Sequence, residues 1–213
     1  MVDAQLVELT AHPSAAAPEP FASPDHPMRL LTRSLALGER FTPTDSAYVQ
    51  GLFNPMAASW SEDHINPTKA APVLDALDRG GVRRSGDWLE IGSGTGAGAR
   101  ALSGRVHSLI CADLAFEMLR HAPTEPPRVQ ADASWLPFTE DRFDTVLLIN
   151  MLLFPAEIDR VLRLNGTVVW VNTLGDQTPI HLPAADVLQA LPGDWAGITA
   201  AAGTGFWLVA QRS

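Results

Sequence analysis

The chain has 213 residues and a formal net charge of −9 at pH 7; 46% of its residues are hydrophobic and 18% are charged. This is the composition of a packed globular protein, and the acidic balance disfavours a nucleic-acid partner, because that affinity comes largely from cations that neutralise phosphates. No apolar run approaches the roughly 20 residues of a membrane-spanning helix, so we expect no membrane insertion. We also expect no secretory leader and, with Cys111 as the single cysteine, no internal disulfide. These features favour a cytoplasmic protein.

The first 80 residues divide into a tail and a helical segment. Residues 1–27 are rich in proline and alanine and offer little to bury, which predicts a mobile tail. Apolar residues at helical spacing predict that residues 28–80 hold helices over 28–37, 45–52 and 67–78.

From residue 81 onward we expect a single domain, over residues 81–213, in which strands and helices alternate. The predicted strands cover residues 88–91, 106–112, 128–130, 145–150 and 167–172, followed by a hairpin of 198–201 and 206–210. The predicted helices cover residues 95–102, 115–121, 157–164 and 183–191. Strands rich in Val, Ile and Leu without alternation suit a sheet covered on both faces. The sequence therefore predicts an α/β, Rossmann-like, doubly wound sheet of seven mostly parallel strands, with an antiparallel C-terminal hairpin and additional N-terminal helices.

A glycine-rich turn joins the first predicted strand of this domain to the helix after it. A dinucleotide fingerprint, G-x-G-x-x-G/A, can be laid over Gly92, Gly94 and Ala97, but alone it is a weak match. The methyltransferase pattern E/D-x-G-x-G-x-G fits Glu90, Gly92, Gly94 and Gly96 at every position. Glu90 discriminates between the two, because a carboxylate there would repel a pyrophosphate but can hold the ammonium of an amino acid.

Asp113 ends the second predicted strand, 23 residues after Glu90. A carboxylate at that place can accept hydrogen bonds from both hydroxyls of a ribose, in a dinucleotide site or in a methyltransferase site. It can equally cap the following helix, and both roles can hold at once.

The third segment, Asp132-Ala133-x-x-Leu136-Pro137-Phe138 followed by Phe143-Asp144-x-Val146, resembles the class I S-adenosylmethionine-dependent methyltransferases that act on small molecules. Together with the glycine-rich turn, the resemblance covers residues 88 to about 170. Upstream, Phe53 to Ser61 is similar to the lid segment of the ubiquinone- and menaquinone-biosynthesis type, with Trp60 in place of the usual tyrosine. The segment 28–80 would then be a lid or substrate-binding segment.

The resemblance implies S-adenosylmethionine as cofactor and S-adenosylhomocysteine as product. Asp132 would bond the adenine amino group, the N–H of Ala133 a ring nitrogen, and Leu114 would pack on the adenine face. Asn150 would face the transferring methyl group. The implied cofactor-binding residues are Glu90, Gly92, Ser93, Gly94, Gly96, Asp113, Leu114, Asp132, Ala133, Asn150 and Trp60.

The sequence assigns no catalytic residue, because the sulfonium is already activated and alignment alone can lower the barrier by up to roughly 7–11 kcal/mol. Asp63, His64, Asp176 and His181 are candidates for a general base, each also readable as a solvated loop residue. The histidines show no metal-binding spacing, so we expect no metal. The acceptor is expected to be a small molecule methylated on O, N or C; the oligomeric state is open.

Two other functions stay as alternatives. One is a methyltransferase fold that binds a partner without catalysis. The other is an NAD(P)-dependent oxidoreductase, which the single tyrosine, Tyr48, and single lysine, Lys69, disfavour, because both precede the predicted sheet.

Overall fold

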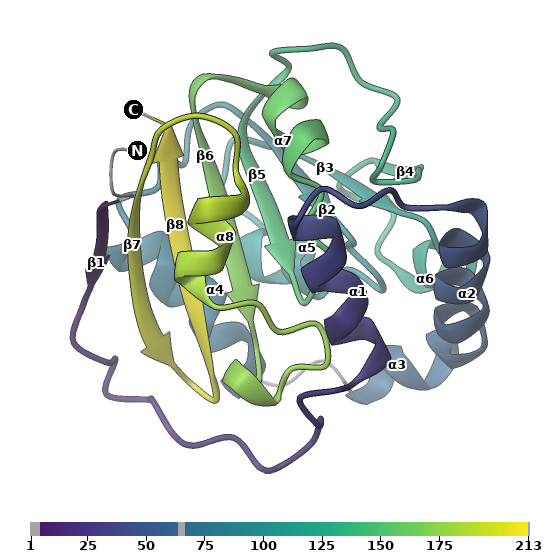
Figure 1. Cartoon of the computed structure of the whole chain (residues 1–213), viewed down its shortest axis with the longest axis horizontal. Helices are drawn as coiled ribbons and strands as arrows, with labels where there is room; N and C mark the ends of the chain where they lie inside the picture. The colour runs from purple at the N-terminus through teal and green to yellow at the C-terminus, as the bar shows by residue number, and fades with distance from the viewer. Residues whose placement is uncertain (1–4, 64–66, 213) are drawn as a thin grey trace.

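The computed structural model describes residues 5–63 and 67–212. Their strands form one sheet in the order β1-β7-β8-β6-β5-β2-β3-β4 (Figure 1). The strands are β1 (Gln5–Glu8), β2 (Asp87–Ile91), β3 (Ser108–Asp113), β4 (Arg128–Gln130), β5 (Phe143–Ile149), β6 (Leu162–Asn172), β7 (Trp195–Ala202) and β8 (Gly205–Arg212). Every neighbouring pair is parallel except β8 with β6 and β8 with β7. The predicted α/β fold with an antiparallel C-terminal hairpin is confirmed, with eight strands rather than seven.

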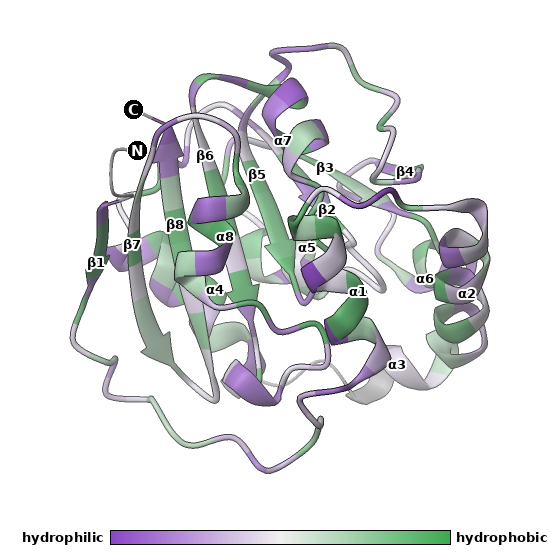
Figure 2. Cartoon of the chain, in the orientation of Figure 1, coloured by the Kyte–Doolittle hydropathy of each residue, from purple (hydrophilic) through white to green (hydrophobic). Residues whose placement is uncertain are grey.

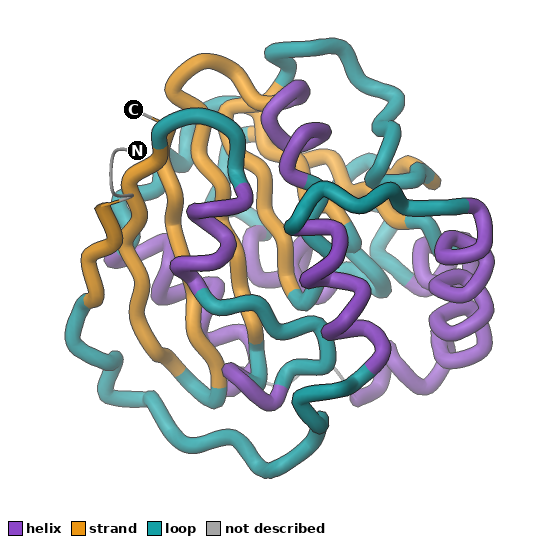
Figure 3. The backbone as a smooth tube through the Cα atoms, in the orientation of Figure 1, coloured by secondary structure: helices purple, strands orange, loops and turns teal. Residues whose placement is uncertain are grey.

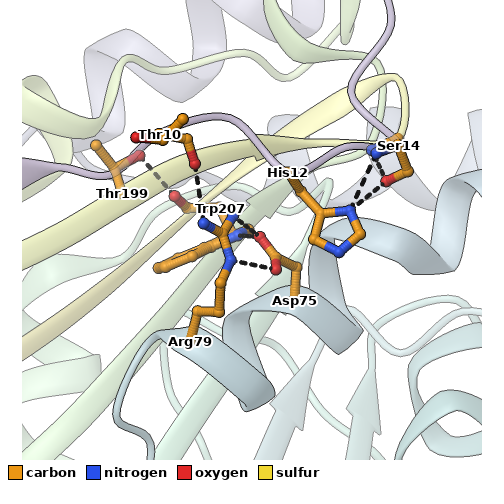
Figure 4. A network of polar contacts seen from close by, with 8 residues as sticks. Thr10, His12, Ser14, Asp75, Arg79, Thr199 and Trp207 are labelled. Carbon is orange, nitrogen blue, oxygen red and sulfur yellow. Dashed lines mark hydrogen bonds and ion pairs between the residues drawn. The ribbon is translucent and has the colours of Figure 1, made fainter.

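The additional strand is β1, and here the expectation of an unstructured tail is wrong. Gln5–Glu8 pairs in parallel with Ala196–Thr199 of β7, so β1 is an edge strand of the sheet. Beyond β1 the chain stays close to β7, where the N–H of His12 donates to the carbonyl oxygen of Ala201 at 2.8 Å. In Figure 4 the guanidinium of Arg79 donates to the carbonyl oxygen of Thr10 on this segment. The strand is missed in the sequence because four residues next to a proline-rich stretch carry no periodic signal.

Helices cover both faces of the sheet (Figures 1 and 3). One face carries α1 (Pro27–Ala36), α7 (Pro155–Val161) and α8 (Ala184–Ala190), and the opposite face carries α4 (Pro67–Arg79) and α5 (Ala97–Leu102). At the β4 end of the sheet, α6 (Phe116–His121) packs against α3 (Ala57–Asp63) and the short helix η1 (Asn54–Met56), which follow α2 (Pro43–Phe53). A second short helix, η2 (Gly175–Gln177), follows β6. None of the helices in residues 5–63 and 67–212 is long and apolar enough to cross a membrane.

Proline sets several helix starts, as its fixed φ and missing N–H suit the first helical position. Pro27, Pro43 and Pro155 begin α1, α2 and α7. The start of α2 is reinforced by a capping box, in which Thr42 and Asp45 each accept a hydrogen bond from the other's backbone N–H.

Alternation along the strands divides the interior into two hydrophobic clusters, and Figure 2 shows the central strands as predominantly hydrophobic. Successive side chains of a strand point to opposite faces, so Leu89 and Ile91 pack on the α1 face, and Trp88 packs on the α4 face. By the same alternation Glu90 points to the α4 face. It stands where a core hydrophobic residue would otherwise be expected.

The predicted helix 157–164 is partly wrong. α7 begins earlier, at Pro155, and ends at Val161, because Leu162 already pairs with Phe143 as the first residue of β6. The ladder then shifts register next to Asn165, whose φ of 64° belongs to the left-handed region that asparagine tolerates. The short helix and the irregular strand together produced the apolar spacing that we read as one helix.

Candidate cofactor site

A cavity of about 330 Å³ opens at the carboxyl ends of β2, β3, β4 and β5. In an open parallel sheet this is the edge where ligands bind. Apart from Gly96, every residue that the sequence implicates lines this one cavity: Glu90, Gly92, Ser93, Gly94, Asp113, Leu114, Asp132, Ala133, Asn150 and Trp60. The structure therefore brings these predicted residues together around one cavity, and their contacts with a ligand stay predictions.

The turn between β2 and α5 requires glycine at two positions for different reasons. Gly92 has a φ of 72°, and a Cβ there would collide with the side chain of Met151. Gly94 also has a positive φ, 53°, but a Cβ there would meet no atom within 4 Å. The space over Gly94 is open toward the cavity, so a ligand can approach this backbone closely. Gly96 lies behind the rim as the cap of α5.

Glu90 lies at the floor of the cavity with only 1% of its surface exposed. Its Oε1 occupies the place that a Cβ on Gly98 would take, so the carboxyl group lies directly under the first turn of α5. It accepts a weak hydrogen bond from the thiol of Cys111 at 3.5 Å and forms no ion pair with the described cations. Burial raises the pKa of Glu90 to about 8, with Cys111 opposing and Asp113 adding to the shift. An ammonium group would supply the missing counter-charge.

The carboxylates of Asp113 and Asp132 both cap backbone turns. Asp113 accepts hydrogen bonds from the N–H groups of Gly94 and Ala115, each at 2.7 Å, and burial raises its pKa despite these bonds. Asp132 accepts from the N–H of Ser134 at 2.8 Å and from its hydroxyl at 2.6 Å. Carboxylate oxygens have spare lone pairs, so these caps leave capacity for ribose and adenine donors. The capping roles are observed and the ligand roles remain predictions.

Asn150 directly follows β5 and lies in the left-handed region, with a φ of 48°. Its amide nitrogen donates to the hydroxyl of Thr173 at 2.8 Å, and its amide oxygen accepts the N–H of Thr173 at 2.9 Å. This reciprocal pair ties the end of β5 to the end of β6. Asn150 therefore has an evident structural role at the cavity wall, beside the predicted one toward the methyl group.

The N-terminal helices supply one wall of the cavity. Trp60 and Phe53 both line it and pack edge to face, with ring centroids 5.7 Å apart. Phe41 and Phe154 form a second such pair across the cavity wall, at 5.3 Å. The segment 28–80 thus meets the cavity, as a lid would, and the lid function itself stays a prediction.

The sequence reasoning missed two basic residues of the cavity wall, Lys69 on α4 and Arg100 on α5. The signal available for Lys69 was that it is the single lysine of the chain. In the sequence alone, this lysine argues only against an oxidoreductase.

The candidates for a general base fall mostly outside the site. Asp176 and His181 do not line the cavity, although Ile180 does. His181 is half-buried against Phe206, and burial and then Arg29 lower its pKa. The side chain of Asp63 and all of His64 lie outside the described residues. Among the residues that the structure describes, no three His, Cys, Asp or Glu side chains are grouped to hold a metal.

The cavity fits the group that the sequence implies. S-adenosylmethionine carries a nucleoside, an ammonium group and a sulfonium. The cavity offers Glu90, which lacks an ion-pair partner among the described residues, an unobstructed backbone at Gly94, and two further carboxylates at neighbouring strand ends. An apolar interior could not satisfy such a cation, whereas a buried carboxylate can.

The comparisons with known proteins agree with this geometry. Residues 89–170 match the methyltransferase domain family. The solved structure of DhpI in complex with SAH superimposes with a TM-score of 0.62 at 22% identity, over 80% of this chain and 98% of that chain. A methyltransferase of Thermotoga maritima gives a TM-score of 0.59 at 12% identity, over 77% and 99%. One of Aquifex aeolicus gives 0.58 at 14% identity, over 82% and 100%.

Other solved structures align with a smaller part of the chain. The YcgJ protein of Bacillus subtilis aligns over only 50% of its own length and 47% of this chain. No curated protein matches the sequence. Residues 89–170 therefore match a methyltransferase domain family, and the chain shares the class I methyltransferase fold of these solved structures.

Proposed function

We propose that the protein transfers the methyl group of S-adenosylmethionine to an O, N or C atom of a small-molecule acceptor. The observation that carries the proposal is the convergence of Glu90, Asp113 and Asp132, from three neighbouring strands, on one cavity beside the glycine turn. A ligand with several separated donor groups could use all three carboxylates, because the two that cap backbone turns keep spare lone pairs.

The strand order orients the proposed ligand. β3 and β4 lie on one side of β2, and β5 and β6 lie on the other. Asp113 and Asp132 would hold the adenosine, and Asn150, which follows β5, would lie on the side of the reacting methyl group. The acceptor then occupies the side next to β6, where the wall is formed by Met28, Phe41, Phe154 and Ile180.

When bound, the cofactor supplies a methyl group that its sulfonium already activates. The protein's residues would align the cofactor with the acceptor and keep water away from the reacting atoms. Glu90 holds the amino-acid end, the Asn150–Thr173 pair fixes the edge that faces the reacting atoms, and the apolar wall excludes water from them. We assign no general base, and the small size of the acceptor rests on the resemblance to small-molecule methyltransferases. The more specific likeness to the ubiquinone type and the cytoplasmic location also remain proposals.

The first test is whether S-adenosylhomocysteine co-purifies with the protein, measured by mass spectrometry after denaturation. We expect it to be present in the wild type and absent from Gly94→Arg, which fills the open space over the turn. Gly104→Arg is a matched control, because Gly104 also has a positive φ (68°) and open space, but lies away from the cavity.

If Gly94→Arg binds S-adenosylhomocysteine as tightly as Gly104→Arg in titration calorimetry, the site is wrong. Bound S-adenosylhomocysteine without methyl transfer to any acceptor of a broad panel would instead favour the non-catalytic alternative.

A further inference from the structure

Two cations line the proposed cofactor cavity on the wall where α4 meets α5. Lys69 lies in the first turns of α4 and Arg100 lies on α5, and these two helices pack against each other. They are the only basic residues among the described residues that line the cavity. The rest of that wall is small or apolar, formed by Ala70, Val73 and Ala97.

Neither cation forms an ion pair with a described residue. Lys69 makes no ion pair and no side-chain hydrogen bond with any described residue. One terminal nitrogen of Arg100, Nη2, is buried and has no hydrogen-bond partner in the described part of the chain. A buried guanidinium nitrogen without a partner costs free energy, so such a group calls for an acceptor that is not part of the protein.

The position of the two cations relative to Glu90 indicates which acceptor. Glu90 lies under the first turn of α5, and Arg100 is close enough to act on its ionisation. The anionic floor and the cationic wall therefore belong to the same end of the cavity. That end lies at the turn after β2, where Asp113 accepts the N–H of Gly94 from the neighbouring strand end, and Asp132 follows β4, two strands away from β2.

An α-amino acid bears an ammonium and a carboxylate on one carbon atom. A site for it needs an anion and a cation side by side, and Glu90 alone meets half of this requirement. We propose that Lys69, supported by Arg100, binds the carboxylate of the cofactor's methionine moiety. The inference rests on the proposed function, since it assumes that the ligand's amino-acid end lies at the β2–α5 turn.

The test compares two ligands that differ only in this carboxylate. These are S-adenosylhomocysteine and its decarboxylated analogue, S-adenosyl-3-thiopropylamine. Calorimetry gives the dissociation constant of each for the wild type, Lys69→Met, Lys69→Arg and a control, Arg83→Met. Arg83 is exposed on the loop between α4 and β2 and does not line the cavity.

Lys69→Met is expected to weaken S-adenosylhomocysteine binding roughly tenfold or more, the usual effect of losing a charge-assisted hydrogen bond. The analogue should bind the wild type and Lys69→Met about equally, since it has no carboxylate to lose. Lys69→Arg should restore most of the affinity, and Arg83→Met should change neither constant.

If Lys69→Met loses affinity equally for both ligands, Lys69 shapes the cavity without contacting the carboxylate, and the inference is overturned. An unchanged affinity for both would overturn it as well. A wild type that binds neither ligand would overturn the proposed function itself, and the two failures are thereby distinguishable.

Discussion

Two buried carboxylates lie on the same face of the sheet and behave in opposite ways. Asp75 on α4 is 5% exposed and Glu90 on β2 is 1% exposed. Asp75 forms an ion pair with Arg79 at 2.5 Å and accepts the indole N–H of Trp207 at 2.6 Å (Figure 4). Among the described side chains, Glu90 accepts a hydrogen bond only from the weak thiol donor of Cys111, at 3.5 Å.

The two environments shift the two pKa values in opposite directions. Burial by itself raises the pKa of Asp75, but the hydrogen bonds from Arg79 and Trp207 outweigh it, and the net shift is downward. Burial dominates for Glu90 and raises its pKa to about 8. A buried carboxylate that its own fold satisfies is part of the architecture, and one that the fold leaves unsatisfied is available to a ligand.

The largest effect is expected from Asp75→Ala. It leaves the indole N–H of Trp207 without its acceptor and Arg79 without its counter-charge, so the free energy of unfolding should fall by about 2–4 kcal/mol. Urea unfolding measures this change. S-adenosylhomocysteine affinity, extrapolated to the folded protein, should stay the same. A loss below about 0.5 kcal/mol would show that the pair is not structural.

The second prediction is a pH dependence of stability that Glu90→Gln reduces, with the raised pKa of Asp113 leaving a contribution of the same sign. The native pKa of Glu90 lies above the unfolded value of 4.5, so the native state binds the extra proton between these values. The free energy of unfolding of the unliganded wild type should therefore decline as pH rises from 4.5 toward 8. Asp75, whose native pKa is lowered, contributes in the opposite sense and loses its stabilising effect only at acid pH.

The affinity for a ligand with an ammonium group should change with pH in the opposite direction to the stability, because an ammonium favours the ionised form of Glu90. Wild-type affinity for S-adenosylhomocysteine should rise with pH up to about 8, by up to roughly tenfold per unit. Glu90→Gln should bind S-adenosylhomocysteine weakly and with a shallower dependence on pH than the wild type. A wild-type affinity that is constant from pH 6 to 8 would contradict the role of Glu90.

The comparison also explains what the sequence could predict. The spacing of Glu90 from the glycines is local and is set by one strand and one turn, so the sequence could predict that these residues lie together. The role of Asp75 could not be predicted from the sequence, because its partner Trp207 lies 132 residues away and only the fold brings the two together.

The same holds for Lys69 and for β1. Lys69 reaches the cavity because α4 packs beside α5, and Gln5–Glu8 is a strand because β7 presents a free edge. Both depend on tertiary contacts, and a local sequence pattern carries no information about these. By contrast, β4 was predicted at residues 128–130 with its observed bounds, because turn residues delimit it on both sides.

Gly98→Ala tests whether the position of the Glu90 carboxyl group matters for ligand binding. The added Cβ would overlap Oε1 of Glu90 and approach Ile149 Cδ1 at 2.8 Å, so the carboxyl group must move from under α5. We expect S-adenosylhomocysteine affinity to fall about tenfold, as for the loss of one charge-assisted contact. Gly51→Ala on α2 is the control, because its Cβ meets nothing within 4 Å and should stabilise the helix slightly. Equal affinities in the two variants would mean that the position of Glu90 is irrelevant to binding.

The smallest predicted effect isolates the hydrogen bond that distinguishes Asp75 from Glu90. Trp207 and Trp88 are both fully buried in the cluster on the α4 face, but the indole N–H of Trp88 has no partner among the described residues. Replacing either by Phe removes a similar volume, and only Trp207→Phe also removes a donor to a carboxylate. Trp207→Phe should therefore cost about 1–2 kcal/mol more than Trp88→Phe in urea unfolding. Equal costs would mean that volume alone is lost and that Arg79 suffices for Asp75, in which case the contrast between the two carboxylates depends on the ion pair and not on the indole.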